Sequence, residues 1–317
     1  MTVESPTARK PSCEKKVECS RTLVNALSFD VEEYFHVHAF KDIIEQNSWD
    51  TYESRVVEST RRILKLLAAK QTHATFFVLG WVAEREPDLV QEIANGGHEI
   101  ASHGYAHQAV SQLTRDQYRT DLERANEAIR SACPTAELKG YRAPSFSINA
   151  STPWAFEELK QADFLYDSSV SPVSLHDRYG VRDAPRFAHE PIAGLVEAPP
   201  STVKLGRHRV AVAGGGHFRF SPLNVTRWAI RNINREGHPV VSYLHPWEFD
   251  PNQPKVRGIG WKSKFRHYVN IEKTERRLES LLDEFSFDRM DRVFATEITQ
   301  ATRQNHEPAE DSAYGSK

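Results

Sequence analysis

The chain has 317 residues, 39% of them hydrophobic, which is enough for one large core, although the length also permits two domains. Its 41 Lys and Arg nearly balance its 43 Asp and Glu, so there is no basic excess for holding a nucleic-acid backbone. The sequence contains no run of roughly 18 apolar residues, which a membrane span would need. It also contains no early apolar run of the kind found in a secretory signal. We therefore expect a cytoplasmic protein with no nucleic-acid partner and no transmembrane segment. Three cysteines are too few for a disulfide framework.

Residues 1–20 and 304–317 are polar and aperiodic, so we expect two disordered tails around a single domain at 21–303. Within that domain the predicted strands are 23–29, 74–79, 99–102, 139–142, 164–166, 195–198 and 240–244. The predicted helices are 54–69, 87–95, 114–132, 152–161, 222–236 and 271–285. Repeated strand–helix alternation is typical of a parallel sheet, closed as a barrel or open with helices on both faces. In either case the active site lies at the carboxyl ends of the strands.

Polar residues gather at those strand ends. Asp30, Glu32 and Glu33 follow the first strand, His103 and His107 the third, Arg142 ends the fourth, Asp167 follows the fifth, and His245 ends the last. Positions of this kind converge on one face of a barrel although they are far apart in the sequence. The pattern therefore predicts one site.

Two histidines four residues apart can bind one metal ion, as His103 and His107 would on a helical turn. This spacing alone carries little weight in a chain with 14 histidines, and two surface histidines are the alternative. Hydrolysis of an amide needs a base for the attacking water and an anionic ligand for the metal, and Asp30 and Glu32 can do one job each. The alternative is that Glu32 and Glu33 stabilise the N-terminus of the next helix.

His245 could protonate a leaving amine because the pKa of histidine lies near neutrality; the alternative is a core histidine. Arg142 could keep Asp30 ionised or form an ordinary ion pair. Gly214 to Gly216 lack the Lys-Ser/Thr of a phosphate-binding loop, and we expect a flexible turn beside the site. The aromatic residues Tyr141, Trp247 and Trp261, together with His36 and His38, could line a sugar-binding cleft or simply pack in the core.

Together these segments resemble the polysaccharide deacetylase superfamily, whose catalytic part is the NodB homology domain. Its first motif, TFDDG, appears as SFDVE at 28–32, and its second as SHGYAH at 102–107. The third appears as YRAP at 141–144, the fourth as YDSS at 166–169, and the fifth as Leu244-His245. The form that these motifs take here is similar to that in deacetylases of bacterial exopolysaccharide and exosortase loci. The segment 261–270, which lies within a carboxyl-terminal extension of about 246–303, is also similar to those proteins.

The resemblance implies an α/β fold, a distorted (β/α) barrel with fewer than eight repeats, and removal of acetyl groups from an N-acetylated glycan with release of acetate. It implies one divalent ion, zinc or alternatively cobalt, nickel or manganese. Its ligands would be His103, His107 and Glu32, with Asp30 as base, Arg142 tuning Asp30, and His245 as acid. We expect the sugar contacts to be Tyr141, Pro144, Asp167 and Trp247. A lipid-linked glycan at the inner membrane face fits the expected location.

The chain departs from the family pattern at the second Asp of TFDDG, which is Val31 here and cannot bind a metal. Some members shift this ligand one place onward, which points to Glu32, with Glu33 as the alternative. Two other functions stay open: a small amide or cyclic imide hydrolase on the same barrel, and a catalytically silent carbohydrate-binding module.

Overall fold

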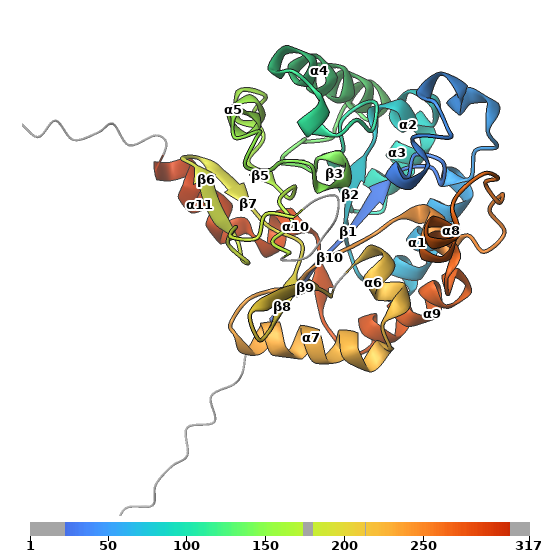
Figure 1. Ribbon diagram of the computed structural model, residues 1–317. Helices are drawn as coiled ribbons and strands as arrows, with labels where there is room; N and C mark the ends of the chain where they lie inside the picture. Colours follow the sequence, from blue (N-terminus) through green and yellow to red (C-terminus); the bar gives the residue numbers. More distant parts are fainter. Residues whose placement is uncertain (1–22, 174–179, 213, 305–317) are drawn as a thin grey trace, which may run out of the picture.

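A curled, mostly parallel sheet organises the protein (Figure 1). The computed structural model describes residues 23–173, 180–212 and 214–304. The nine-stranded sheet has the order β10-β1-β2-β3-β4-β5-β7-β6, and β11 also pairs with β1. Its strands are β1 (Asn25–Val31), β2 (Thr75–Val78), β3 (Glu99–Ser102), β4 (Gly140–Tyr141), β5 (Tyr166–Asp167), β6 (His189–Ile192), β7 (Leu195–Glu197), β10 (Val241–Leu244) and β11 (Phe287–Asp288). Only β6, which returns alongside β7, is antiparallel in the described sheet. The expected incomplete barrel with fewer than eight repeats is confirmed.

Helices surround this sheet (Figure 1). They are α1 (Val56–Ala69), α2 (Gly80–Arg85), α3 (Pro87–Asn95), α4 (Arg115–Ala132), α5 (Trp154–Gln161), α6 (Gly215–Phe220), α7 (Leu223–Arg235), α8 (Trp261–Tyr268), α9 (Ile271–Leu282), α10 (Met290–Val293) and α11 (Ala295–Gln304). Local sequence sets several ends: Thr114 and Gln117 form a capping box at α4, and Pro87 occupies the first turn of α3. A separate hairpin consists of β8 (Thr202–Leu205) and β9 (His208–Ala211). None of the helices in the described part of the chain is long and apolar enough to cross a bilayer.

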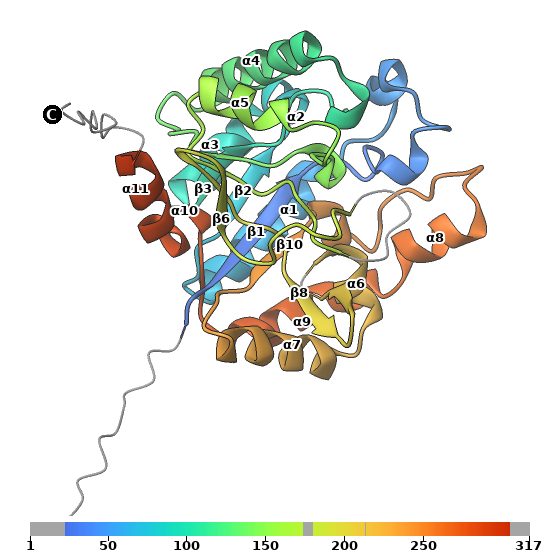
Figure 2. The same cartoon turned by 60° about the vertical axis from the view of Figure 1, so that its left-hand side comes forward.

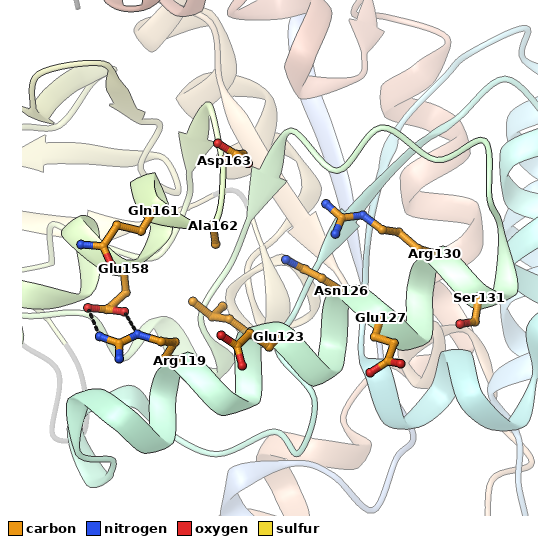
Figure 3. A pocket seen from close by; sticks show the side chains of 11 residues that line it. Arg119, Glu123, Asn126, Glu127, Arg130, Ser131, Glu158, Gln161, Ala162 and Asp163 are labelled. Carbon is orange, nitrogen blue, oxygen red and sulfur yellow. Dashed lines mark hydrogen bonds and ion pairs between the residues drawn. The ribbon is translucent and has the colours of Figure 1, made fainter.

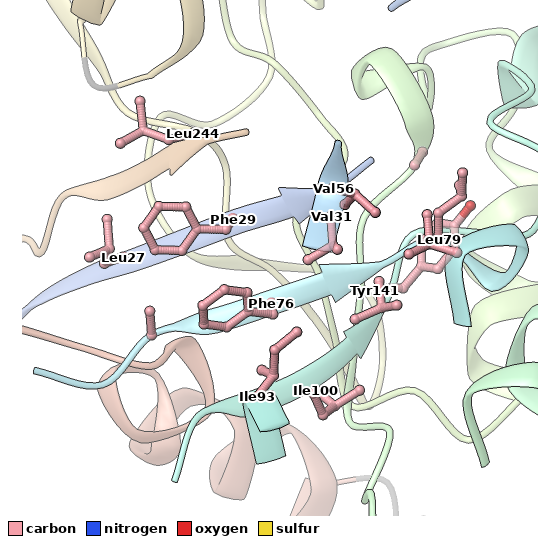
Figure 4. Close-up of a cluster of buried hydrophobic side chains, with 14 of the residues drawn as sticks. Leu27, Phe29, Val31, Val56, Phe76, Leu79, Ile93, Ile100, Tyr141 and Leu244 are labelled. Carbon is pink, nitrogen blue, oxygen red and sulfur yellow. The ribbon is translucent and has the colours of Figure 1, made fainter. Parts of the chain in front are cut away.

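The alternation of side chains along β1 separates core from site. Leu27, Phe29 and Val31 point toward the covering helices and belong to the main hydrophobic cluster (Figure 4). Burying a side chain of this size stabilises the fold by about 1.5–3 kcal/mol. Ser28 and Asp30 alternate with them and therefore point to the inner face of the curled sheet. The central strand thus supplies both the core and the first carboxylate of the candidate site.

The amino-terminal end of the inner face is filled by the last two helices, α10 and α11 (Figure 2). A second hydrophobic cluster joins Phe77 and Tyr166 of the sheet to Met290 and Phe294 of these helices. The backbone N–H of Met290 also donates to Thr75 Oγ1 on β2 at 2.8 Å. The carboxyl ends of the strands are left for the polar residues.

Every predicted strand and helix is present, with ends that differ by a few residues. The first strand extends to Val31 instead of ending at residue 29, so Asp30 lies within it. The expected flexible turn at Gly214–Gly216 is wrong, because Gly215 and Gly216 begin helix α6 and Gly214 is the extended residue just before it. A Cβ at Gly214 would lie 2.2 Å from the Tyr243 ring, so the glycine permits this close packing. The predicted tails at 1–20 and 305–317 lie outside the described residues, and Gln304 ends α11.

Candidate active site

Three predicted metal ligands lie together at the carboxyl ends of β1 and β3. One ligand atom from each of Glu32, His103 and His107 falls within 4.8 Å of the others. Glu32 Oε2 is 2.6 Å from His107 Nε2. His107 adopts a left-handed backbone conformation with φ of 50°, which is uncommon outside glycine and asparagine. Two imidazoles and one carboxylate are a donor set typical of catalytic zinc, so these residues fit a divalent ion.

The charge states of the cluster also suit a metal. Burial lowers the pKa of His103 to about 4, which keeps its imidazole neutral at physiological pH. Its Nδ1 lies 2.8 Å from the carbonyl oxygen of Arg142, which can only accept, so Nδ1 carries the proton and Nε2 keeps its lone pair. Burial alone would raise the pKa of Glu32, but the neighbouring His107, together with His245 and His103, holds it well below its ordinary range. Glu32 is therefore a carboxylate.

Trp247 supports this cluster and does not offer a sugar-stacking surface. It is 6% exposed, and its indole N–H donates to Glu32 Oε1 at 3.2 Å. Its ring stacks between the imidazoles of His245 and His267, with centroid distances of 5.1 and 4.3 Å. The expected sugar contact at Trp247 is therefore corrected: the residue orients the Glu32 carboxylate.

Arg142 fixes Asp30 on the inner face of the sheet. The guanidinium is fully buried and donates to Asp30 Oδ1 at 2.6 Å and to Ser28 Oγ at 2.9 Å. Its other nitrogens donate to the Oγ of Ser168 at 3.0 Å and to the Ser168 carbonyl at 3.3 Å. Because the guanidinium is held at several points, its hydrogen-bonding fork fixes the orientation of the Asp30 carboxyl group.

His245 faces both carboxylates. Its Nε2 lies 3.8 Å from Asp30 Oδ2 and 3.8 Å from Glu32 Oε1. Its Nδ1 is 3.0 Å from Glu248 Oε2, and Glu248 accepts a hydrogen bond from the buried Arg219 at 2.6 Å. Burial would lower the pKa of His245, but the hydrogen bond and charge of Glu248, with the charges of Glu32 and Asp30, raise it to about 9. The His245 side chain keeps 17% exposure, so it is the most open of these groups to a substrate.

Glu33 and Val31 point away from the cluster. The Glu33 carboxylate accepts hydrogen bonds from Ser54 Oγ at 2.6 Å and from the backbone N–H groups of Arg55 and Val56 at 3.0–3.2 Å. It therefore stabilises the N-terminus of α1, the alternative considered for both glutamates. Val31 is fully buried in the main core. Of the candidate third ligands, the structure brings only Glu32 to the two histidines.

The other expected sugar contacts are corrected as well, because these side chains are buried. Tyr141 is 1% exposed and packs against Tyr118 and Phe164, since it alternates with Arg142 and faces the helices. Pro144 is also buried. His36, which could have lined a cleft, packs against Trp49 and Trp81 in the core.

Asp167 is fully buried and forms a carboxyl pair with Glu197, its partner on the neighbouring strand β7. Ser169 Oγ donates to Asp167, and the N–H groups of Ser169 and Val170 donate to Glu197. Burial raises the pKa of Asp167, and burial together with the charge of Asp167 raises that of Glu197. Asp167 thus fixes the turn after β5 and has no surface for a sugar.

A groove of about 730 Å³ lies elsewhere, between α4 and α5 (Figure 3). Its walls carry the ion pair of Arg119 with Glu158 and several exposed charged side chains. It shares no residue with the cluster at the strand ends, so it is not part of the candidate site.

The residues around His245 were not predicted. Glu248 and Arg219 hold the imidazole, and His267 stacks behind Trp247. One signal was present in the sequence: a glutamate three residues after His245, at a spacing where a short 3-10 turn after Pro246 brings both side chains together. Arg219 lies 29 residues away from Glu248 in the sequence and carried no such signal.

Comparison with known proteins identifies similarity to deacetylases in part of the chain. The family model described as polysaccharide deacetylase matches residues 45–164, and a domain of unknown function, DUF3473, matches residues 168–295. A chitooligosaccharide deacetylase of Sinorhizobium fredii is 39% identical over 85 residues, which cover 27% of this chain and 40% of the relative. A peptidoglycan-N-acetylglucosamine deacetylase of Bacillus cereus is 38% identical over 90 residues, 28% of this chain and 30% of the relative. The matches thus span less than half of these relatives.

The whole fold has a counterpart among solved structures. A candidate polysaccharide deacetylase from Mycobacterium smegmatis superimposes with a TM-score of 0.57 over 94% of this chain and 96% of that one, at 22% identity. This likeness shows the fold alone. With the match of the deacetylase model and the identity to named deacetylases over short segments, the chain contains a polysaccharide deacetylase domain that includes residues 45–164.

Proposed function

We propose that the protein is a metal-dependent hydrolase that removes the N-acetyl group from an N-acetylhexosamine-containing glycan and releases acetate. One observation carries the proposal: His245 Nε2 lies 3.8 Å from a carboxylate oxygen of both Asp30 and Glu32. An acid, a base and a metal-ligand cluster therefore share one small space. Relatives named chitooligosaccharide and peptidoglycan-N-acetylglucosamine deacetylases support the substrate class.

Glu32, His103 and His107 would hold the ion, zinc by the donor set, with cobalt, nickel or manganese as alternatives. When bound, a divalent ion there would polarise the acetyl carbonyl and lower the pKa of the attacking water. Trp247 keeps the Glu32 carboxylate oriented through its indole N–H. The Arg142 carbonyl fixes the tautomer of His103.

Asp30 accepts the proton of the attacking water, and the hydrogen bond from Arg142 holds its carboxyl group in place for this step. Attack forms a C–O bond at the acetyl carbon, and the C–N bond then breaks. His245, whose pKa of about 9 keeps it protonated at neutral pH, donates its proton to the departing nitrogen. The products are acetate and a free amine on the sugar, so a neutral residue of the glycan becomes cationic.

The natural polymer is proposed to be an exopolysaccharide intermediate, in a lipid-linked form at the inner membrane face. This part rests on the resemblance of the motif wording and of the extension at 246–303, which the DUF3473 match overlaps. Side-chain contacts to a sugar are not assigned, because the expected contact residues are buried.

The test is acetate release from N-acetylglucosamine oligomers, with small amides and cyclic imides as competing substrates. Asp30→Asn and His245→Ala are expected to lower acetate release by at least about 100-fold, the usual contribution of an acid or base. Asp42→Asn, at an exposed position, is the matched control. Full activity of either site variant would refute the scheme, and hydrolysis of small amides alone would favour the first alternative.

A silent carbohydrate-binding module is tested by metal content. We expect one divalent ion per chain by elemental analysis and its loss in His103→Ala. Binding of oligosaccharides without a stoichiometric ion and without acetate release would establish the silent module.

A further inference from the structure

The outer face of α8 carries large aromatic side chains that the fold leaves in solvent. Trp261 is 75% exposed and Phe265, one turn later, is 59% exposed. Phe220, at the end of α6, is 38% exposed and stacks on Phe265 with a centroid distance of 5.7 Å. We call Trp261, Phe265 and Phe220 the aromatic patch. Contiguous exposed aromatic side chains of this size mark an interaction surface.

The same segment is strongly basic, although the whole chain has a formal net charge of -2. Residues 251–271 contain five Lys and Arg and no Asp or Glu. The basic residues are Lys255, Arg257, Lys262, Lys264 and Arg266, and all five are exposed. In the described part of the chain none of them forms an ion pair, whereas most other arginines of the protein do. Their charges are therefore available to an anionic partner.

The helix is firmly attached on its inner side. His267 is 3% exposed, stacks on Trp247 and lies 2.7 Å from Gln253 Oε1 through its Nε2. Arg219 donates to the carbonyl oxygens of residues 266, 267 and 269 at 2.6–3.1 Å. Because the helix end is held this way, exposure of the patch is a fixed property of the fold. The helix that bears the patch also contacts the site, since His267 on its buried side stacks on Trp247.

We infer that α8 docks the protein onto an anionic lipid bilayer. Tryptophan and phenylalanine side chains insert at the boundary between headgroups and acyl chains, and flanking Lys and Arg bind anionic headgroups. Both kinds of side chain are present on one helix that Figures 1 and 2 place at the periphery of the molecule. A second copy of the chain is disfavoured as partner, because a symmetric contact would bring two sets of unpaired positive charges together.

The test is co-sedimentation of the full-length protein with vesicles of phosphatidylcholine alone or with about 30% phosphatidylglycerol. We expect binding to the anionic vesicles at low salt and at least about tenfold weaker partitioning to the neutral ones. Trp261→Ala with Phe265→Ala should weaken anionic-vesicle binding at least about tenfold, as should Lys262→Gln, Lys264→Gln and Arg266→Gln together.

Matched controls change the same kinds of residue elsewhere. Trp228→Ala removes an exposed tryptophan from α7, and Lys65→Gln, Arg130→Gln and Arg235→Gln together remove three exposed charges from α1, α4 and α7. Both controls are expected to bind as the parent protein does. Equal loss in the controls, equal binding to neutral vesicles, or no binding to either would overturn the inference.

Two further results would also overturn it. One is a dimer by light scattering that the patch variants dissociate, which would make α8 an interface between copies. The other is patch-dependent binding to a soluble anionic glycan with no binding to vesicles. Vesicle binding is measured without turnover, so its outcome is independent of whether the proposed deacetylation occurs.

Discussion

Replacing Glu248 by Gln tests whether the Glu248 carboxylate sets the pKa of His245, the proposed acid. Glu248 is fully buried and accepts from both the N–H and the Nδ1–H of His245. Glutamine keeps the shape and one acceptor but removes the charge. Burial alone lowers the pKa of His245, and the hydrogen bond and charge of Glu248 contribute most to raising it to about 9. Without that charge we expect the pKa of His245 to return to about its ordinary value of 6.5.

The expected loss of activity follows from the protonated fraction of His245. At pH 8, a pKa of about 9 leaves about nine-tenths of the imidazole protonated, whereas 6.5 leaves about 3%. The rate of acetate release should therefore fall about thirtyfold at pH 8 but only about 1.3-fold at pH 6. Because a general acid must be protonated to act, a lower pKa of His245 moves the basic limb of the pH profile to lower pH.

The assay is a profile of kcat/KM for acetate release between pH 5.5 and 9.5, accompanied by thermal denaturation. Glu158→Gln is the matched control, because Glu158 is also a buried glutamate held by arginines, but it lies between α4 and α5. It should lose similar stability and keep the parent profile. A Glu248→Gln variant whose activity falls by the same factor at pH 6 and pH 8 would refute the reasoning.

Further predictions concern the support of the site and of the sheet. Trp247→Phe keeps the ring stack but removes the indole donor to the cluster carboxylate, so zinc affinity measured by calorimetry should fall about 10- to 100-fold. Relative to the parent protein, Asp167→Asn should become more stable as the pH rises from 4 to 8, by about 1.4 kcal/mol or more in the free energy of unfolding by urea. The reason is that burial raises the pKa of Asp167, so the parent protein loses stability as rising pH removes the proton of its Asp167 carboxyl group. The asparagine variant does not titrate, and its side-chain amide can donate to Glu197. Gly140→Ala places a Cβ 2.1 Å from the Tyr166 ring and should lower stability by about 1–3 kcal/mol.

Three results would contradict these expectations. Unchanged zinc affinity in Trp247→Phe would mean that the indole does not hold the carboxylate. A stability difference for Asp167→Asn that is the same at both pH values would mean that the carboxyl pair does not share a proton. Gly260→Ala, where nothing lies within 4 Å of the added Cβ, is the control for Gly140→Ala and should be nearly neutral.

The position of the site could be predicted because parallel strands end at a common edge. Asp30, His103, Arg142 and His245 lie on four different strands or just beyond them, and the structure brings them together through this topology. From the sequence, Glu32 was the preferred third ligand and Glu33 was the alternative. The choice depends on the path of the chain into α1, where Glu33 accepts from the first backbone amides.

The direction of side chains in very short strands was harder to predict. Strand β4 has only two residues, Gly140 and Tyr141, so no periodicity reveals which side faces the helices. Once Arg142 is placed inside, alternation puts Tyr141 outside, and the expected sugar contact is lost. The role of Trp247 depends on its hydrogen bond to Glu32, which lies 215 positions away in the sequence, so no local sequence pattern reveals it. Helix α10 escaped prediction because it spans only four residues.

The pairing of β1 has a consequence for how the protein is made. This strand is synthesised long before two of its neighbours, β10 and β11, at residues 241–244 and 287–288. Met290 then lies against the guanidinium of Arg142, with Sδ 3.8 Å from a guanidinium nitrogen. The surroundings of the central strand and of the buried arginine are complete only after residues 287–290 have been synthesised. Contacts between residues so far apart in the sequence favour slow folding, and unpaired strand edges stay exposed to other chains until these contacts form. During synthesis, the demand for a chaperone should therefore be highest just before the last helices leave the ribosome.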